Sequence, residues 1–193
     1  MNAGPQLRRG TGADANSAAE VYLRARRHAV PEIPPLAHPD DEVRQWMHSV
    51  LDDQEAWLAV ADDGTVLGLM VLDGDWIEQL YMDPAWTGRG LGTRFVELAK
   101  QRRPGGLQLW TFVSNVRAQR FYERHGFTVA ERTDGSGNEE KAPDLRYVWR
   151  PPAPEAEQAS LTAMHAHRAT ATPGDGSGRS PIAAMSGRLS PQV

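Results

Sequence analysis

The sequence contains no cysteine among its 193 residues. This absence excludes disulfide bonds, thiolate-bound zinc and a cysteine nucleophile. A chain without cysteine is compatible with a reducing compartment, where disulfide bonds do not persist. We therefore expect a cytoplasmic protein.

Long apolar runs are missing as well. No segment approaches the roughly 20 apolar residues that a membrane helix needs, and no apolar stretch follows Arg8 and Arg9 as it would in a secretory signal. The formal net charge of −4 gives no reason to expect the basic surface that nucleic-acid binding requires. We expect a soluble protein that is not exported and has no nucleic-acid partner.

The composition changes sharply near Pro151. Residues 151–193 are rich in Pro, Ala, Ser, Gly and Thr and contain no aromatic residue. Such a segment cannot bury enough apolar surface to offset the entropy of ordering it. We predict one folded domain over residues 1–150 and a disordered tail over residues 151–193. His165 and His167 in this tail are interpreted as solvated side chains, and no metal site is predicted.

The hydrophobic pattern of residues 1–150 changes several times between strand and helix periodicity. Thr11 and Asp14 have the spacing of a capping box before the first helix. Asp63-Gly64 and Asp73-Gly74 separate the strands of a predicted meander. The order of elements predicts an α/β fold with a mixed, mostly antiparallel sheet of about seven strands and helices on both faces. The expected strands are 7–9, 56–60, 66–72, 76–82, 107–112, 127–132 and 145–149.

A glycine-rich loop, TGRGLGT at residues 87–93, lies between a predicted strand and a predicted helix. Glycines at 88, 90 and 92 let the backbone approach a ligand and direct its N–H groups inward, and the helix adds the positive end of its dipole. The pattern indicates a phosphate site, although a tight strand-to-helix connection would also explain the glycines. A P-loop is excluded because no Gly-Lys-Ser/Thr run opens the helix, and Thr93 excludes a dinucleotide fingerprint.

Two segments resemble the motifs of one protein family. TGRGLG (87–92) is similar to Arg/Gln-x-x-Gly-x-Gly/Ala, and NVRAQRFYERHGF (115–127) is similar to Asn-x-x-Ala-x-x-Phe-Tyr-x-x-x-Gly-Phe. The opening LRRGTGADANSAAEVY (7–22) looks like the family's first strand and helix. Over roughly residues 6–150 the chain resembles the GCN5-related N-acetyltransferases, the GNAT family. The resemblance implies the GNAT fold and the transfer of an acetyl group from acetyl-CoA to an amine.

The resemblance places acetyl-CoA along the strand and loop of the first motif. Backbone groups at the strand end would hold the pantetheine arm, and a bulge there would part this strand from the next one; the alternative is an unbroken central strand. Thr87 stands where the family has Arg or Gln, so Arg89 is considered as the source of charge for the pyrophosphate. The residues implied in acetyl-CoA binding are Leu80, Tyr81, Met82, Thr87, Gly88, Arg89, Gly90, Leu91, Gly92, Thr93, Asn115, Ala118 and Phe121.

Two residues are implied in catalysis. Tyr122 would be the general acid, because a tyrosine with a pKa of about 10 keeps its proton at neutral pH and can pass it to the departing thiolate. The alternative for Tyr122 is a core aromatic residue. Glu78 would be the general base, and strict alternation along its strand places it on one face with Trp76, Leu80 and Met82. The alternative for Glu78 is a solvated charge.

The expected mechanism is direct transfer in a ternary complex, without a covalent enzyme intermediate. A backbone N–H near Met82 would stabilise the oxyanion. Asn115 is expected to contact the cofactor arm, to cap its helix, or both. A catalytically silent acyl-CoA-binding module and an acyltransferase using a different acyl-CoA remain alternatives.

The acceptor is expected near the proline-rich segment between the first two helices. The resemblance suggests Tyr22, Glu32 and His38 as parts of its wall, although His38 is equally well explained as a residue that precedes a helix. The sequence does not distinguish a protein N-terminus, a lysine, an antibiotic amine and a small metabolite. A homodimer is an arrangement that many members of the resembled family adopt.

Overall fold

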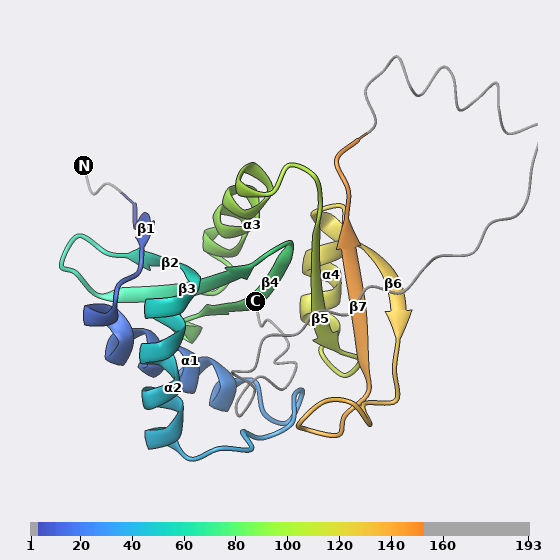
Figure 1. The fold of residues 1–193 in the computed structure, drawn as a ribbon, viewed down its shortest axis with the longest axis horizontal. Helices are drawn as coiled ribbons and strands as arrows, with labels where there is room; N and C mark the ends of the chain where they lie inside the picture. The colour runs from blue at the N-terminus through green and yellow to red at the C-terminus, as the bar shows by residue number, and fades with distance from the viewer. Residues whose placement is uncertain (1–3, 153–193) are drawn as a thin grey trace, which may run out of the picture.

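The computed structural model describes residues 4–152, so all but the first two residues of the predicted tail lie outside the described part. The helices and strands follow the order expected from the sequence (Figure 1). They are β1 (Gln6–Arg9), α1 (Ala15–His28), α2 (Asp40–Asp53), β2 (Glu55–Val60), β3 (Val66–Asp73), β4 (Trp76–Met82), α3 (Leu91–Arg102), β5 (Leu107–Phe112), α4 (Val116–Arg124), β6 (Thr128–Arg132) and β7 (Asp144–Trp149). Two short 3-10 helices, Gly12–Asp14 and Pro84–Trp86, precede α1 and the glycine-rich loop.

The seven strands form one sheet in the order β1-β2-β3-β4-β5-β7-β6. Neighbouring strands are antiparallel except β4 and β5, which run parallel. A parallel pair needs a crossover connection, and α3 supplies it between β4 and β5. The prediction of a mixed, mostly antiparallel sheet is confirmed.

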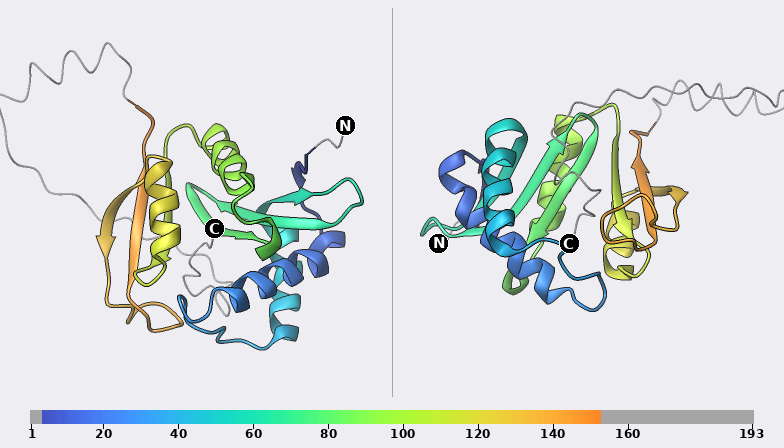
Figure 2. Two further views of the ribbon diagram at one scale, coloured as in Figure 1. Left: turned by 180° about the vertical axis from the view of Figure 1, so that it is seen from behind. Right: turned by 60° about the horizontal axis from the view of Figure 1, so that its bottom comes forward.

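The two faces of the sheet are covered by different helices (Figure 2). One apolar cluster joins α1 and α2 to one face, through strand residues such as Leu69, Val71 and Tyr81. The other joins α3 and α4 to the opposite face, through residues such as Met70 and Leu80. This division follows from the period of two in a strand, which sends successive side chains to opposite faces. Helices on both faces were expected and are confirmed.

Local capping explains where the helices begin. The backbone N–H of Thr11 donates to Asp14 Oδ2 at 3.0 Å, so the predicted capping box is present before α1. The Asn115 side chain accepts from the backbone N–H of Ala118 at 3.0 Å and caps α4. Asp40 opens α2 at the end that favours negative charge.

The sheet divides between β4 and β5. The two strands form a ladder at one register position, Trp76 opposite Gln108, and the Gln108 N–H donates to the Asp75 carbonyl beside it at 2.8 Å. Farther along, β5 continues its pairing with β7 through Asp144 opposite Phe112, while β4 pairs only with β3. The facing edges of β4 and β5 therefore separate toward Met82, and this divergence is called the split below.

Across residues 4–152, every helix is too short or too polar to traverse a bilayer. The same residues bring together no group of three or more His, Asp or Glu side chains that could hold a metal ion.

Candidate active site

β4 contains an irregularity at Glu78. Gln79 pairs with Val71, whereas the next residue of β3, Leu72, pairs with Ile77, so Glu78 is an extra residue in the ladder. An extra residue of this kind is a β-bulge, which bends the strand and increases its twist. The bulge expected in this strand is present, but it lies at Glu78 and not at the strand end near Met82.

The bulge changes which residues share a face of β4. Ile77 and Leu80 both pack in the α3–α4 cluster although they are three residues apart, and Gln79 lies opposite Val71 of the α1–α2 cluster. Strict alternation through the whole strand is therefore wrong, and Trp76, next to Ile77, does not share a face with Leu80 and Met82. The face of Glu78, the extra residue, stays a prediction. Alternation fails because the extra residue shifts the phase of the strand.

Glu78 has the environment of a half-buried carboxylate. Burial, and to a smaller extent the neighbouring Asp73 carboxylate, raise its pKa from 4.5 to about 6. Asp73 lies opposite Trp76 at the start of β4, next to the position where β4 and β5 separate. A carboxylate with a pKa near 6 is ionised at neutral pH and is more basic than an ordinary glutamate.

Tyr122 lies on α4 and is completely buried. Its ring packs against Phe121, Phe127 and Tyr147 at centroid distances of 5.2, 5.6 and 6.3 Å. Its hydroxyl has no hydrogen-bond partner among residues 4–152. Burial raises the pKa of this hydroxyl well above its usual value, and Tyr81 on β4 contributes in the same direction. The ring is thus a core aromatic, as one alternative predicted, but its orphan hydroxyl needs a further explanation.

A pocket of about 270 Å³ lies at the start of α3. Its wall combines the end of β4, the glycine-rich loop and one face of α4. Gly88 and Gly90 adopt φ of 74° and 83°, a conformation that side chains disfavour, and an added Cβ on either would meet no other atom within 4 Å. The lining residues are Met82, Trp86, Thr87, Gly88, Gly90, Gly92, Thr93, Arg117, Phe121 and Arg124.

The charge in this pocket comes from α4 and not from the loop. Arg117, Phe121 and Arg124 recur at helical spacing, so their side chains share one face. The Arg89 guanidinium instead lies over the Trp86 ring, 4.9 Å from its centroid, and Arg89 does not line the pocket. The interpretation of Arg89 as the source of charge is therefore not supported by its position.

Thr87 is occupied by the local fold. Its hydroxyl donates to the Pro84 carbonyl at 2.9 Å and closes the short helix before the loop. The sequence contained a signal for the missing arginines: residues 117 and 124 flank the implied Phe121 by four and three positions on the same helix. Of the other implied residues, Leu91 and Ala118 are buried in the core between the sheet and α3 and α4.

Backbone groups at the end of β4 face the split. The N–H of Asp83 donates to the Leu67 carbonyl of β3 at 2.9 Å. Because successive N–H groups of a strand point in opposite directions, the Met82 N–H is directed away from β3, toward β5. Leu80 and Tyr81 are completely buried beside it. Contact of these strand residues with the pantetheine arm stays a prediction.

The suggested acceptor residues lie on the α1 side of the sheet. Tyr22 is buried, and its ring contacts the Tyr81 ring at a centroid distance of 4.7 Å. His38 contacts Glu42 at 3.1 Å and Glu139 at 3.3 Å, and the hydrogen bond to Glu42 raises the pKa of His38. Glu32 is exposed. The structure thus brings Tyr22 to β4 and His38 to the β6–β7 loop.

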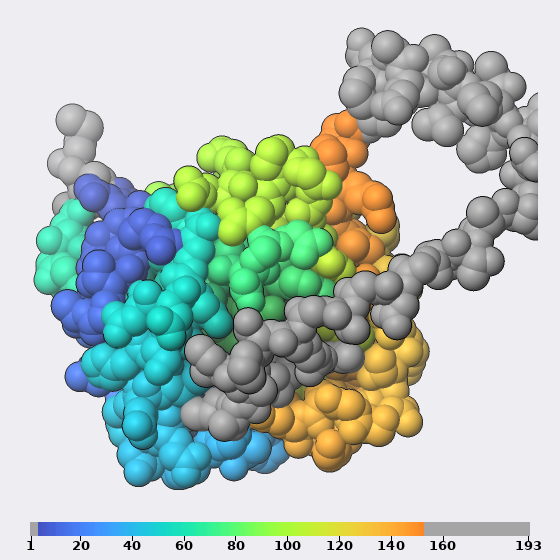
Figure 3. Space-filling view, in the orientation of Figure 1, coloured from blue at the N-terminus to red at the C-terminus, as the bar shows by residue number. Residues whose placement is uncertain are grey.

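The loop between β6 and β7 closes against the connection between α1 and α2 (Figure 3). Arg26 of α1 forms an ion pair with Glu140 at 2.9 Å, and its Nη2 also approaches the Pro34 carbonyl at 3.4 Å. This contact could not be predicted from the sequence, because the paired residues are 114 positions apart.

Comparison with known proteins agrees with this geometry. Residues 20–127, more than half of the chain, match the Acetyltransferase (GNAT) family. The chain belongs to the GNAT family. The resemblance seen in its two motifs is confirmed.

Curated relatives match about half of the chain. The peptidyl-lysine N-acetyltransferase YjaB of Salmonella typhimurium is 34% identical over 95 residues, which cover 48% of this chain and 63% of the relative. YjaB of Escherichia coli is 33% identical over 95 residues with the same shares. The matched region therefore spans less than two thirds of the length of these relatives.

Solved GNAT structures match more of the chain. The solution structure of apo-form YjaB from Escherichia coli has a TM-score of 0.63 at 24% identity, with 76% of this chain and 98% of that chain covered. PaiA N-acetyltransferase from Thermoplasma acidophilum, in complex with coenzyme A, has a TM-score of 0.56 at 18% identity, with 77% and 99% covered. At these identities the likeness concerns the fold.

Proposed function

We propose that this GNAT protein transfers the acetyl group of acetyl-CoA to a primary amine. One observation carries the proposal: the glycine-lined pocket at the start of α3 is lined both by Met82, at the open end of the split, and by Phe121, which directly precedes the buried Tyr122. The relatives named above support it, because their names state N-acetyltransferase activity and one solved structure holds coenzyme A.

The residues at the pocket fit the phosphates of acetyl-CoA. Gly88 and Gly90 leave space where a side chain would stand, and N–H groups at the start of α3 are free to bind an anion. Arg117 and Arg124 add two positive charges from the opposite wall. Together they compensate for the threonine at position 87, whose hydroxyl is already bound to Pro84.

Acetyl-CoA supplies the activated acyl group, and the chain supplies proton transfer and orientation. Glu78 takes a proton from the acceptor ammonium, directly or through water, so that the amine nitrogen can form its bond to the acyl carbon. The Met82 N–H donates to the developing oxyanion. As the carbon–sulfur bond breaks, Tyr122 gives its proton to the departing thiolate. Nitrogen gains the acetyl group and loses its second proton, which through solvent restores the Tyr122 hydroxyl. Sulfur gains the Tyr122 proton, Glu78 passes its proton to solvent, and no group on the protein is acylated.

The acceptor class is the open part of this proposal. YjaB is named for peptidyl lysine, and another solved relative, at 21% identity and a TM-score of 0.58, is a nourseothricin acetyltransferase. We propose an amine acceptor here.

Calorimetry with CoA and an acetyl-transfer assay test the proposed function. Because the chain has no cysteine, a thiol reagent measures only the CoA that turnover releases. We expect CoA to bind and Tyr122→Phe to lower kcat about 100-fold to 10,000-fold, the usual size of a general-acid effect, with unchanged CoA affinity. Phe127→Leu is the matched control, because Phe127 packs against the same ring without reaching the split. CoA binding without turnover on any amine would favour a silent binding module instead.

A further inference from the structure

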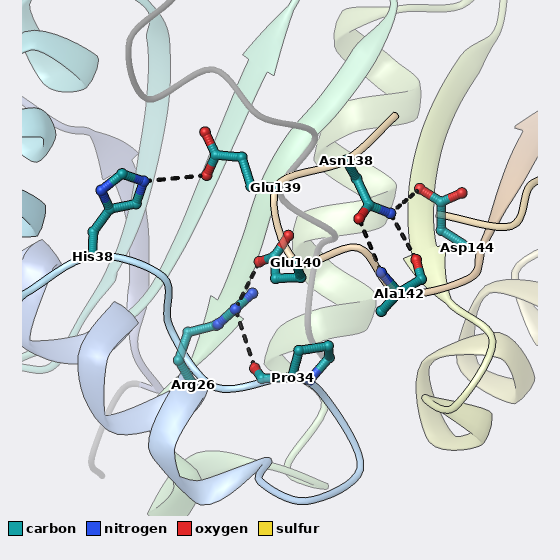
Figure 4. A network of polar contacts seen from close by, with 8 residues as sticks. All are labelled: Arg26, Pro34, His38, Asn138, Glu139, Glu140, Ala142 and Asp144. Atoms are coloured by element: carbon teal, nitrogen blue, oxygen red, sulfur yellow. Dashed lines mark hydrogen bonds and ion pairs between the residues drawn. The ribbon is translucent and has the colours of Figure 1, made fainter. Parts of the chain in front are cut away.

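Polar side chains from three elements lie on the α1 side of β4. Arg26 of α1 pairs with Glu140 of the β6–β7 loop (Figure 4), and Gln79 of β4 lies opposite Val71 on the same side of the sheet. The side chains of Arg26 and Glu140 are only 1% and 2% exposed, and Gln79 is 4% exposed. Gln79 directly follows Glu78 in the chain, so this cluster adjoins the proposed general base.

Tyr81 connects the cluster with the proposed general acid. Burial raises the pKa of Tyr81, while the Arg26 charge and hydrogen bonding to Arg26 and Tyr22 lower it. Tyr81 in turn contributes to the raised pKa of Tyr122. The guanidinium of Arg26 is therefore close to Tyr81, the residue of β4 that precedes Met82.

The hydrogen bonding of this cluster is incomplete. Nη2 of Arg26 serves both Glu140 Oε1 and the Pro34 carbonyl. Of the buried side-chain atoms without a partner among residues 4–152, four belong to this cluster: Arg26 Nε, Arg26 Nη1, Glu140 Oε2 and Gln79 Oε1. Unpaired buried polar atoms are costly, and a buried ion pair repays its desolvation only when the remaining atoms are satisfied. The cluster thus offers two charged donors and two acceptor oxygens to a ligand.

The position of Glu140 is fixed by its own loop. The Asn138 side chain donates to the Ala142 carbonyl at 2.7 Å and to Asp144 Oδ2 at 3.0 Å, and it accepts from the Ala142 N–H at 3.2 Å (Figure 4). A loop held from within in this way presents Glu140 as part of a pre-formed surface. The incomplete pairing is therefore a property of a rigid arrangement.

We propose that the acceptor amine carries a carboxylate, as an amino acid does, and that Arg26 and Glu140 recognise this head group together. This inference rests on the proposed acetyltransferase function. The ligand carboxylate accepts from Nε and Nη1 of Arg26, and the amino group donates to Glu140 Oε2 and Gln79 Oε1. A head group with both charges matches the ion pair without adding net charge to a buried site.

An alkylamine without a carboxylate would leave the Arg26 donors unpaired. A site built to hydrogen-bond a substrate group rejects an analogue that lacks it far more strongly than a hydrophobic pocket does. The competing interpretation is a purely structural clasp, in which Arg26 and Glu140 only tie the β6–β7 loop to α1. A clasp of that kind predicts no preference for carboxylates.

Matched acceptors separate the two interpretations. Release of CoA thiol would be measured with phenylalanine, phenylalaninamide and phenethylamine, and with lysine and cadaverine. In each set that reacts, we expect kcat/KM for the acceptor that carries a carboxylate to be at least about tenfold higher than for the acceptors that lack one. Equal rates within the sets, a preference for the amide, or no reaction with either set by a protein that binds acetyl-CoA would each overturn the inference.

Variants test whether Arg26 is the source of the preference. Arg26→Gln would abolish the preference, and the Arg26→Gln/Glu140→Gln double variant does so without leaving a buried charge unpaired. Arg44→Gln is the control, because Arg44 forms an exposed ion pair with Glu20 between α1 and α2. Retention of the full carboxylate preference in the folded double variant would assign these residues a structural role only.

These experiments distinguish a failure of the inference from a failure of the proposed function. A protein that binds acetyl-CoA and acetylates amines without regard to a carboxylate refutes the inference and leaves the acetyltransferase assignment intact. A protein that shows no calorimetric signal with CoA or acetyl-CoA refutes the proposed function itself, and the inference with it.

Discussion

The glycine-rich loop before α3 and the loop between β6 and β7 serve the two substrates of the proposed reaction by different physical means. The first offers backbone N–H groups and open space at Gly88 and Gly90, with arginines from α4 nearby. The second offers side chains, Glu139 and Glu140, held by a buried asparagine. Recognition by backbone leaves glycines at fixed spacing in a sequence, whereas recognition by side chains depends on long-range contacts.

The largest predicted effect is on CoA affinity, on the cofactor side of the site. Replacing Arg117 and Arg124 together with Gln should weaken CoA binding about 100-fold, since each removes a charge-assisted contact with a phosphate. Arg120→Gln is the matched control on the same helix, because Arg120 is exposed and does not line the pocket. Calorimetry measures the difference, and equal affinities for the double variant and the control would remove the α4 arginines from the site.

The pH dependence of turnover tests the role of Glu78 as the general base. Glu78 acts as a base only when ionised, and its pKa is raised to about 6 by burial and by Asp73. We expect kcat to fall about tenfold for each pH unit below this value. Asp73→Asn should move the fall to lower pH, because it removes the neighbouring negative charge. A profile that is flat between pH 5 and 7, as ordinary titration near 4.5 would give, would contradict a Glu78 base whose pKa is raised to about 6.

A smaller effect is expected from the acceptor-side loop. Gly135 has φ of 83°, and an added Cβ would lie 2.2 Å from the Ala142 carbonyl carbon. Gly135→Ala should raise the KM for the amine several-fold while leaving CoA affinity unchanged, and the strained backbone should cost at least about 1 kcal/mol of stability. Gly64→Ala is the control, since φ is 86° there and no atom lies within 4 Å of the added Cβ.

Denaturant unfolding of both glycine variants separates strain from contact. Both should lose stability through the unfavourable φ, but only Gly135→Ala should also disturb the amine KM. If both variants change the KM equally, the β6–β7 loop has no special link to the acceptor.

The smallest effect is predicted for a residue inside the motif itself. Arg89→Gln should change CoA affinity by less than about twofold, because the guanidinium lies on the Trp86 ring and is exposed. A loss as large as that of the α4 variants would restore the interpretation that the sequence alone suggested.

Much of the fold could be predicted from the sequence because periodicity reports burial. The strands and helices lie close to their expected positions, and the two faces of the sheet follow from alternation. The bulge could be expected but not placed, since its position depends on the register between Val71 and Gln79. That register is a property of two strands and is not visible in one of them.

The residues of the candidate site also differ in whether a local sequence pattern reveals them. The glycines and Tyr122 belong to local motifs and could be predicted, while Arg117 and Arg124 could have been recognised from their helical spacing around Phe121. The Arg26–Glu140 pair could not be predicted, because only the folded sheet brings α1 to the β6–β7 loop. A single sequence contains no signal for such a contact.

A structure of the protein with CoA bound tests the central claim most directly. We predict that the pyrophosphate lies against the backbone N–H groups of residues 88–92, with Arg117 and Arg124 on its phosphates. The sulfur should reach the split within hydrogen-bonding distance of the Tyr122 hydroxyl. A CoA molecule bound away from the α3 pocket, or a sulfur that does not enter the region between β4 and β5, would contradict the proposed site.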